Sequence, residues 1–199
     1  MKTKFLWLGL FAVFILVPLR ASGADSARQV IENLHSTIIS VMKQADELKY
    51  EGRYNHLEPV IKASYDFKFI CRIIAGRYWR GFTDAQRDEF VKVFTRLSIA
   101  TYAGRFDGYS GESFKLVSLK ELRRGRLMVK TLMMKKKREL VELNYVLHNR
   151  NNQWLIINVI ADGVSDISLK RADYTTFLKK NGFRALLDKL AEKIDLEAG

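Results

Sequence analysis

The histidines and the single cysteine are the first side chains to consider for catalysis or metal binding. His35, His56 and His148 fall in three different predicted elements, without the HExxH motif or the Cys/His spacing of a zinc site. Cys71 has no partner for a disulfide within the chain, so we expect a buried small hydrophobic residue. The sequence therefore predicts no metal site, no redox motif and no cofactor.

Two serines lie in segments that share features with a hydrolase nucleophile. The run Gly-Tyr-Ser-Gly at 108–111 lacks the elbow glycine, because Glu112 stands there, and it leads from a helix to a strand instead of the reverse. Ser165 follows a predicted strand and precedes a helix but also lacks the glycines, so we expect Ser165 or Asp166 to cap that helix. There is no phosphate-binding loop. We predict that the protein is not an enzyme.

The chain is basic, with a formal net charge of +12 at pH 7. Its cations gather in two predicted turns at opposite ends of an antiparallel sheet, so they form no continuous stripe for nucleic acid. Either they are solvated turn residues that maintain solubility, or they contact anionic lipid headgroups or an acidic partner. The candidate docking residues are Arg123, Arg124, Lys135, Lys136, Lys137 and Arg138.

The N-terminal segment has the parts of a secretory signal peptide. Lys2 and Lys4 precede an apolar run at 5–17, and Ser-Gly-Ala at 22–24 supplies the small residues of a cleavage site. The apolar run is shorter than the roughly 20 residues of a spanning helix, although an uncleaved anchor is the alternative. We expect cleavage after Ala24, export to the periplasm, and a mature single domain of residues 25–199.

Hydrophobic periodicity orders the mature chain as helices, then strands, then helices. A period near 3.6 predicts a helix from Ser26 to about Lys49 and a short one from about His56, with Pro59 in its first turn. Thr83 and Gln86 form a capping box that opens a long helix. The predicted helices after His56 are 66–75, 83–106, 167–180 and 183–194.

Beyond Gly108 the period changes to two. Four strands are predicted at 114–122, 126–134, 140–148 and 154–161, and their short connections favour an antiparallel meander. The second and fourth strands are apolar on both faces, which a sheet with one solvated face would not be. Either the sheet is buried between helices, or part of its apolar surface lines a ligand cavity. The predicted fold class is α+β.

Several segments, in order along most of the mature chain, share the pattern of one family. They are 73–79, 83–87, 100–104, 154–165, with its Asp-Gly-Val-Ser ending, and 170–174, which reads Lys-Arg-Ala-Asp-Tyr. Together they resemble the MlaC (toluene-tolerance) family of periplasmic lipid-binding proteins. Residues 102–112 look like the hopanoid-associated branch of that family, called HpnM.

The resemblance implies a curved sheet wrapped by N- and C-terminal helices, around an apolar cavity that holds a lipid as cargo. It also implies transfer of phospholipid or hopanoid between the MCE-domain component of an inner-membrane ABC transporter complex and an outer-membrane partner. The long helix must lie against one period-2 face of the sheet. We therefore predict a cavity wall of Tyr102, Phe106, Val129, Thr131, Leu143, Tyr145, Ile157 and Val159. The alternatives are an envelope adaptor with a filled core and an envelope hydrolase.

Overall fold

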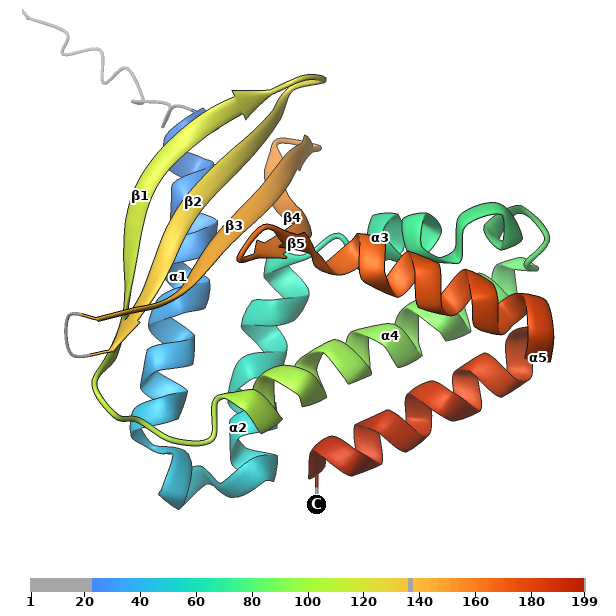
Figure 1. Cartoon of the computed structure of the whole chain (residues 1–199), viewed down its shortest axis with the longest axis horizontal. Helices are drawn as coiled ribbons and strands as arrows, with labels where there is room; N and C mark the ends of the chain where they lie inside the picture. Colours follow the sequence, from blue (N-terminus) through green and yellow to red (C-terminus); the bar gives the residue numbers. More distant parts are fainter. Residues whose placement is uncertain (1–22, 136–137, 199) are drawn as a thin grey trace, which may run out of the picture.

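A computed structural model describes residues 23–135 and 138–198 and confirms the α+β class (Figure 1). The helices are α1 (Gly23–Lys43), α2 (Ala45–Ser64), α3 (Phe67–Ala75), the 3-10 helix η1 (Gly76–Arg80), α4 (Asp84–Arg105) and α5 (Asp166–Ala198). The strands are β1 (Glu112–Leu122), β2 (Arg126–Lys135), β3 (Arg138–Arg150), β4 (Gln153–Ala161) and β5 (Val164–Ser165).

Most of the predicted signal peptide, residues 1–22, lies outside the described residues, so cleavage after Ala24 stays a prediction. Lys136 and Lys137 also lie outside them. Among the helices that the structure describes, none is both long enough and apolar enough to cross a membrane.

The two N-terminal helices differ from the prediction in their boundaries. α1 ends at Lys43, and α2 begins at Ala45 instead of near His56, so Pro59 lies well inside α2. The chain leaves the helical conformation at Lys49, where φ is 55° and ψ is −172°. This break coincides with the predicted end of the first helix at about Lys49, whereas the interruption at Gln44 was not predicted. The buried stripe of α1 includes Ala27, Ile31, Leu34, Ile38 and Val41.

The predicted start signals of the later helices are confirmed. At the start of α4, the Thr83 backbone amide donates to Gln86 Oε1 at 2.9 Å, and the Gln86 amide donates to Thr83 Oγ1 at 3.2 Å. At the start of α5, the Ser168 amide donates to Ser165 Oγ at 3.4 Å, so Ser165 caps this helix. Gly182, with φ of 80°, divides α5 into the two predicted arms.

The sheet is an antiparallel meander in the order β1-β2-β3-β4-β5. Four strands were expected, and the structure adds a fifth of two residues, in which Val164 and Ser165 pair with Ala161 and Ile160. Tyr65 pairs with Ile156 elsewhere on the same edge of β4. The free edge of the last long strand is therefore covered at two points.

A β-bulge in β4 changes which of its side chains share a face. Tyr145 of β3 pairs with Val159, but Leu147 pairs with Ile156, so Ile157 is the extra residue. Strict alternation would place Ile157 on the same face as Val159. The bulge instead brings Ile156 to that face.

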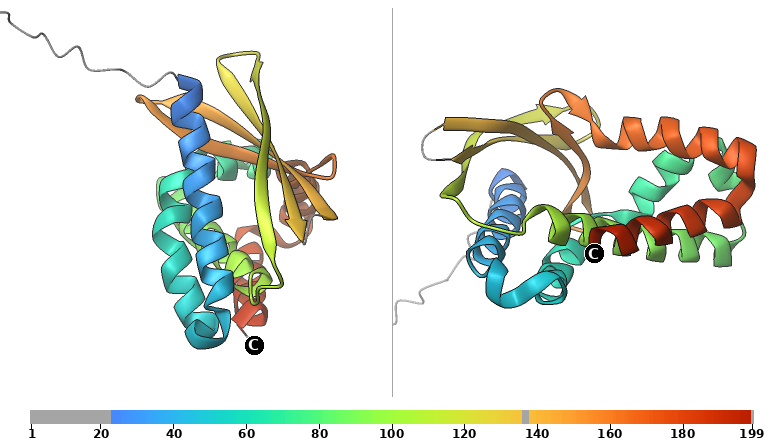
Figure 2. Two further views of the ribbon diagram at one scale, coloured as in Figure 1. Left: turned by 90° about the vertical axis from the view of Figure 1, so that its left-hand side faces the viewer. Right: turned by 60° about the horizontal axis from the view of Figure 1, so that its bottom comes forward.

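Helices cover one face of the sheet and extend beyond it (Figure 2). α1 contacts β1 and β2 and lies beside α2, while the second arm of α5 runs along α4. Buried residues from every layer form the core, among them Ile31, Leu57, Ile74, Phe90, Leu147, Ile156 and Leu186. α1 thus lies over β1 and β2 and reaches β4, while α5 also contacts β4.

Candidate functional site

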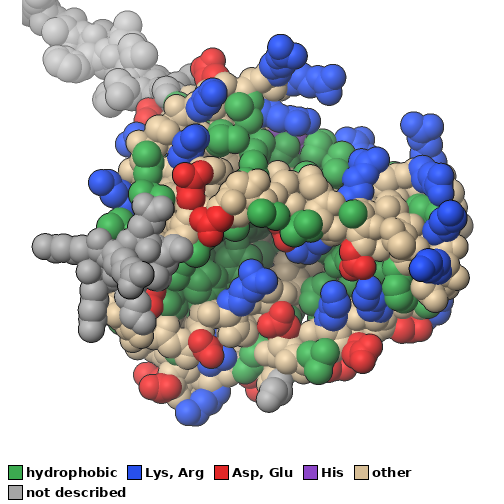
Figure 3. All heavy atoms as spheres, in the orientation of Figure 1, with side chains coloured by type: hydrophobic (Ala, Val, Ile, Leu, Met, Phe, Trp, Pro, Cys, Tyr) green, Lys and Arg blue, Asp and Glu red, His purple; other side chains and the backbone are tan. Residues whose placement is uncertain are grey.

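A cavity of about 620 Å³ lies where β3 and β4 face α4 and α5. Figure 3 shows a hollow in the middle of this side of the molecule, with hydrophobic side chains at its back. Leu143, Tyr145 and Val159 line it from the sheet, and Ile167 and Leu196 line it from the two arms of α5. The volume lies within the range of about 300–1,000 Å³ that is typical of small-molecule sites.

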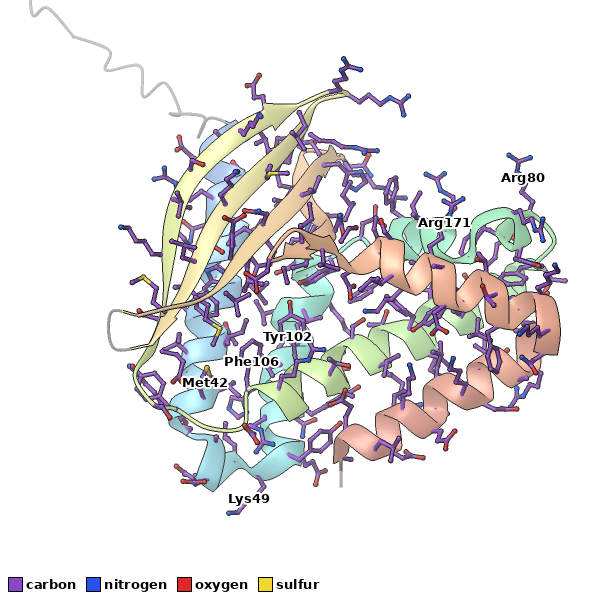
Figure 4. All side chains as sticks on the ribbon, viewed as in Figure 1. Met42, Lys49, Arg80, Tyr102, Phe106 and Arg171 are labelled. Atoms are coloured by element: carbon purple, nitrogen blue, oxygen red, sulfur yellow. The ribbon has the colours of Figure 1, made fainter. Side chains whose placement is uncertain are left out.

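Aromatic rings form the wall that joins the helices to the sheet. Tyr102 and Phe106, at the end of α4, point toward the sheet in Figure 4, with ring centroids 5.6 Å apart. Tyr65 and Phe67, which follow α2, add stacked rings with centroids 5.5 Å apart. Tyr65 is held there because the next residue, Asp66, donates its amide to the Ile156 carbonyl on β4 at 3.1 Å.

The tyrosine hydroxyls at this wall are paired with one another or with His35. Tyr65 and Tyr102 hydroxyls lie 2.5 Å apart, and the Tyr145 hydroxyl lies 3.0 Å from His35 Nε2. Burial raises the pKa of Tyr102 to about 12 and the pKa values of Tyr65 and Tyr145 well above the ordinary value. All three are neutral phenols at physiological pH. At this wall the cavity is therefore lined by neutral, hydrogen-bonded hydroxyls.

Charged side chains of both signs surround the mouth of the cavity. Asp166 forms an ion pair with Lys170, and Lys189 Nζ lies 3.2 Å from an oxygen of Asp173. Arg105 and Lys193 also line the cavity and are exposed to solvent. An apolar interior with a charged mouth suits a ligand that has a long apolar part and a polar or charged end.

The structure brings together five of the eight residues predicted for the wall. Those that line the cavity are Tyr102, Phe106, Leu143, Tyr145 and Val159. The other three, Val129, Thr131 and Ile157, do not line this cavity, and Thr131 lines a second, smaller hollow instead. α1 covers the face of β2, where Val129 is fully buried and Thr131 is 1% exposed, and the bulge displaces Ile157 from the predicted face.

A model of the MlaC protein family matches residues 32–192. The chain belongs to the MlaC family. A solved structure of a phospholipid-binding protein from Ralstonia solanacearum, in complex with a phospholipid, has a similar fold, with a TM-score of 0.77. The two sequences are 18% identical, and the match covers 90% of this chain and 100% of the other. The MlaC-like fold predicted from the sequence is thus confirmed.

The contribution of α5 to the cavity of this MlaC-family protein was not predicted. Leu169 and Leu196 are 60% and 73% exposed, although both are large apolar residues on an amphipathic helix. From their sequence positions alone, Leu169 and Leu196 could belong to apolar faces that pack on the core. Only the reversal at Gly182, which returns the second arm along α4, brings both arms to the cavity.

The candidate docking residues of this MlaC-family protein lie at opposite ends of the meander, as predicted. Arg123 and Arg124 are exposed in the β1–β2 turn. Lys135 ends β2 and Arg138 begins β3, while Lys136 and Lys137 between them lie outside the described residues. Near the β1–β2 turn, the guanidinium carbons of Arg72 and Arg126 lie 5.1 and 5.8 Å from the Phe69 ring centroid. We call Arg72, Arg123, Arg124 and Arg126 the basic pole.

His148 of this MlaC-family protein belongs to a hydrogen-bonded cluster around Asp66, and Cys71 is buried. Asp66 caps α3 and accepts hydrogen bonds from His148 at 3.0 Å and Arg150 at 3.2 Å. Burial raises the pKa of the Cys71 thiol well above its ordinary value, so it stays protonated. Within the described ranges, no group of three or more His, Cys, Asp or Glu side chains could hold a metal ion.

Proposed function

We propose that this MlaC-family protein is a periplasmic carrier that holds a lipid in the cavity between β3, β4, α4 and α5. The observation that carries the proposal is an apolar cavity of about 620 Å³ with a charged mouth. The similar structure from Ralstonia solanacearum, solved with a phospholipid, supports it. A filled core would favour an adaptor protein instead, and this cavity argues against that alternative.

Phospholipid and hopanoid are the rival cargoes. Arg105, Lys170 and Lys193 line the mouth together with Asp166, Asp173 and Glu197. Lys170 is paired with Asp166, which leaves Arg105 and Lys193 to face a phosphate group. A hopanoid hydrocarbon offers no such charge. We therefore propose a glycerophospholipid as the main cargo.

Carriage of a lipid requires no covalent chemistry. Each methylene contributes about 0.8 kcal/mol to membrane binding, so one sixteen-carbon chain costs on the order of 10 kcal/mol to move into water. A cavity of neutral, partnered side chains removes most of this barrier by keeping the chain out of water. A protein of this kind needs a cavity and docking surfaces rather than catalytic groups.

The partners would be the MCE-domain component of an inner-membrane ABC transporter complex and an outer-membrane protein. The basic pole and the second basic turn, Lys135 to Arg138, are the candidate docking surfaces. Phe69, between Arg72 and Arg126, gives the basic pole an aromatic residue beside its charges. Arginine with an aromatic residue is a common composition of interaction surfaces.

The test is the lipid content of a protein whose cavity is filled. Val159→Trp places an indole in the cavity and should reduce the lipid that co-purifies per folded molecule, measured by native mass spectrometry and lipid extraction. Val117→Trp is the matched control, because Val117 is 52% exposed on β1 and does not line the cavity. Lipid loading that is unchanged in Val159→Trp, or absent from the wild type, would overturn the proposal.

A further inference from the structure

A second hollow, of about 390 Å³, lies between α1 and the strands β1 and β2. Its interior is apolar, with Ile31 and Ile39 from α1 and Phe114 and Leu116 from β1. Glu32 and Ser36, which are exposed on α1, also line it. The family resemblance and the main cavity leave this hollow without a role.

The second hollow and the main cavity share a thin wall at two places. Tyr145 lines the main cavity, His35 lines the second hollow, and the Tyr145 hydroxyl lies 3.0 Å from His35 Nε2. Leu143 lines the main cavity, Thr131 lines the second hollow, and Thr131 Oγ1 donates to the Leu143 carbonyl at 2.8 Å. At each place a single hydrogen-bonded pair of residues separates the two spaces.

We propose that the second hollow is a further compartment of the lipid site, which receives one apolar chain of a two-chain lipid when the His35–Tyr145 contact opens. This inference rests on the proposed carrier function. The main cavity has the size of a site for one drug-sized ligand, and the two acyl chains of a diacyl lipid together need more apolar space than such a ligand. The side chains needed for a second chain are already in place behind the wall.

The His35–Tyr145 contact is suited to a wall that opens. Burial lowers the pKa of His35 to about 4, so the contact joins two neutral groups at physiological pH. A neutral hydrogen bond is weaker than a charge-assisted one, and space on both sides leaves room for the rings to move. His35 also stacks on Phe114, with centroids 3.8 Å apart, so opening the wall would separate these two rings as well.

Substitutions that fill the second hollow test whether it holds one acyl chain while the main cavity holds the other. Leu116→Trp and Ile39→Trp fill it from the strand side and from the helix side, and Val117→Trp, at the neighbouring exposed residue, is the control. Each protein, delipidated, is incubated with vesicles of diacyl phosphatidylglycerol or with its one-chain lyso form. Bound lipid is then quantified by native mass spectrometry.

We expect wild type and Val117→Trp to bind both lipids. The two filled variants should bind the one-chain lipid as wild type does and the diacyl lipid at least about tenfold more weakly, a loss equivalent to the contacts of about two methylenes. Circular dichroism identifies a variant that fails to fold, and the other variant then decides whether the second hollow holds a chain. If both variants fail to fold, Ser36→Trp, from the exposed rim of the hollow, replaces them.

Three results would overturn the inference or its basis, and they are distinguishable. Folded variants that bind diacyl lipid with wild-type affinity would show that the second hollow holds no chain. Equal loss of both lipids would show that the substitution damages the main cavity instead. A wild type that binds neither lipid would refute the carrier function itself.

Discussion

His35 is a titratable side chain held in its neutral form by burial between α1 and the sheet. It is 8% exposed, and desolvation lowers its pKa from 6.5 to about 4. Between these two values the unfolded chain binds a proton that the folded protein does not. The free energy of unfolding should therefore fall as pH decreases from about 6.5 to 4, by up to about 3 kcal/mol from this residue.

Urea unfolding of wild type and His35→Gln at pH 7 and pH 4 measures this contribution. The variant keeps a polar side chain but cannot titrate, so its loss of stability on acidification should be smaller than that of the wild type. Equal losses in the two proteins would mean that another group accounts for the acid sensitivity.

At the scale of one residue, Val129 is a core position and Val159 is a cavity-wall position. Val129 is fully buried between Leu119 and Tyr145 in the register of the sheet, under α1. Val129→Trp should therefore lower the free energy of unfolding by at least about 1–3 kcal/mol through overpacking. Val159→Trp should cost less, because the indole can enter the cavity.

Thermal denaturation of the two lipid-free variants gives this comparison. A stable Val129→Trp with reduced lipid loading would contradict the assignment to the core and would restore Val129 to the cavity wall, where the sequence had placed it.

At the scale of elements, two helix breaks share one backbone conformation but not one residue type. Gly182 in α5 has φ of 80° and ψ of −177°, and Lys49 in α2 has φ of 55° and ψ of −172°. This region is essentially restricted to glycine, and any other residue there costs about 1–3 kcal/mol. Lys49 is exposed, so its side chain offers little to offset the strain (Figure 4).

Lys49→Gly should therefore raise the free energy of unfolding by roughly 1 kcal/mol, the relief of strain less the greater chain entropy of glycine. Lys92→Gly, at an exposed and regular position of α4, is the control and should lower it by about 1 kcal/mol. Chemical denaturation of both variants measures the two shifts. A decrease for Lys49→Gly as large as that for Lys92→Gly would show that position 49 is not strained.

Hydrophobic periodicity and helix-end signals predicted most of the helices and strands. The position of the cavity depended on two features that leave no such signal in the sequence. The capping box at Thr83, the antiparallel meander and the paired arms around Gly182 follow local rules, and the structure confirms them. The bulge at Ile157 does not, because one extra residue leaves an apolar strand looking the same. How much of the helix-covered face of the sheet α1 occupies cannot be predicted from local sequence either, because it depends on how the helices pack.

At the scale of the whole molecule, the meander places the two basic turns at opposite ends of the sheet. In the basic pole, Arg72 and Arg126 lie over the Phe69 ring, near the β1–β2 turn. Among the interactions of the described residues, Arg123 and Arg124 take part in no ion pair, so their charge is available to an anionic partner. Electrostatic attraction of this kind raises association rates and is screened by salt.

The last prediction follows from the availability of the Arg123 and Arg124 charges to an anionic partner. Arg123→Glu combined with Arg124→Glu should slow association with vesicles containing anionic lipid by about tenfold or more at low salt, and should flatten the dependence of the rate on ionic strength. Stability should change by less than about 0.5 kcal/mol per substitution, because both side chains lie in an exposed turn.

Lys92→Glu combined with Lys180→Glu is the charge-matched control, with both residues exposed on helices outside the basic pole. Stopped-flow association at several salt concentrations measures the rates. If the control slows association as much as the turn variant does, the net charge of the protein governs the encounter and the basic pole is not a docking surface.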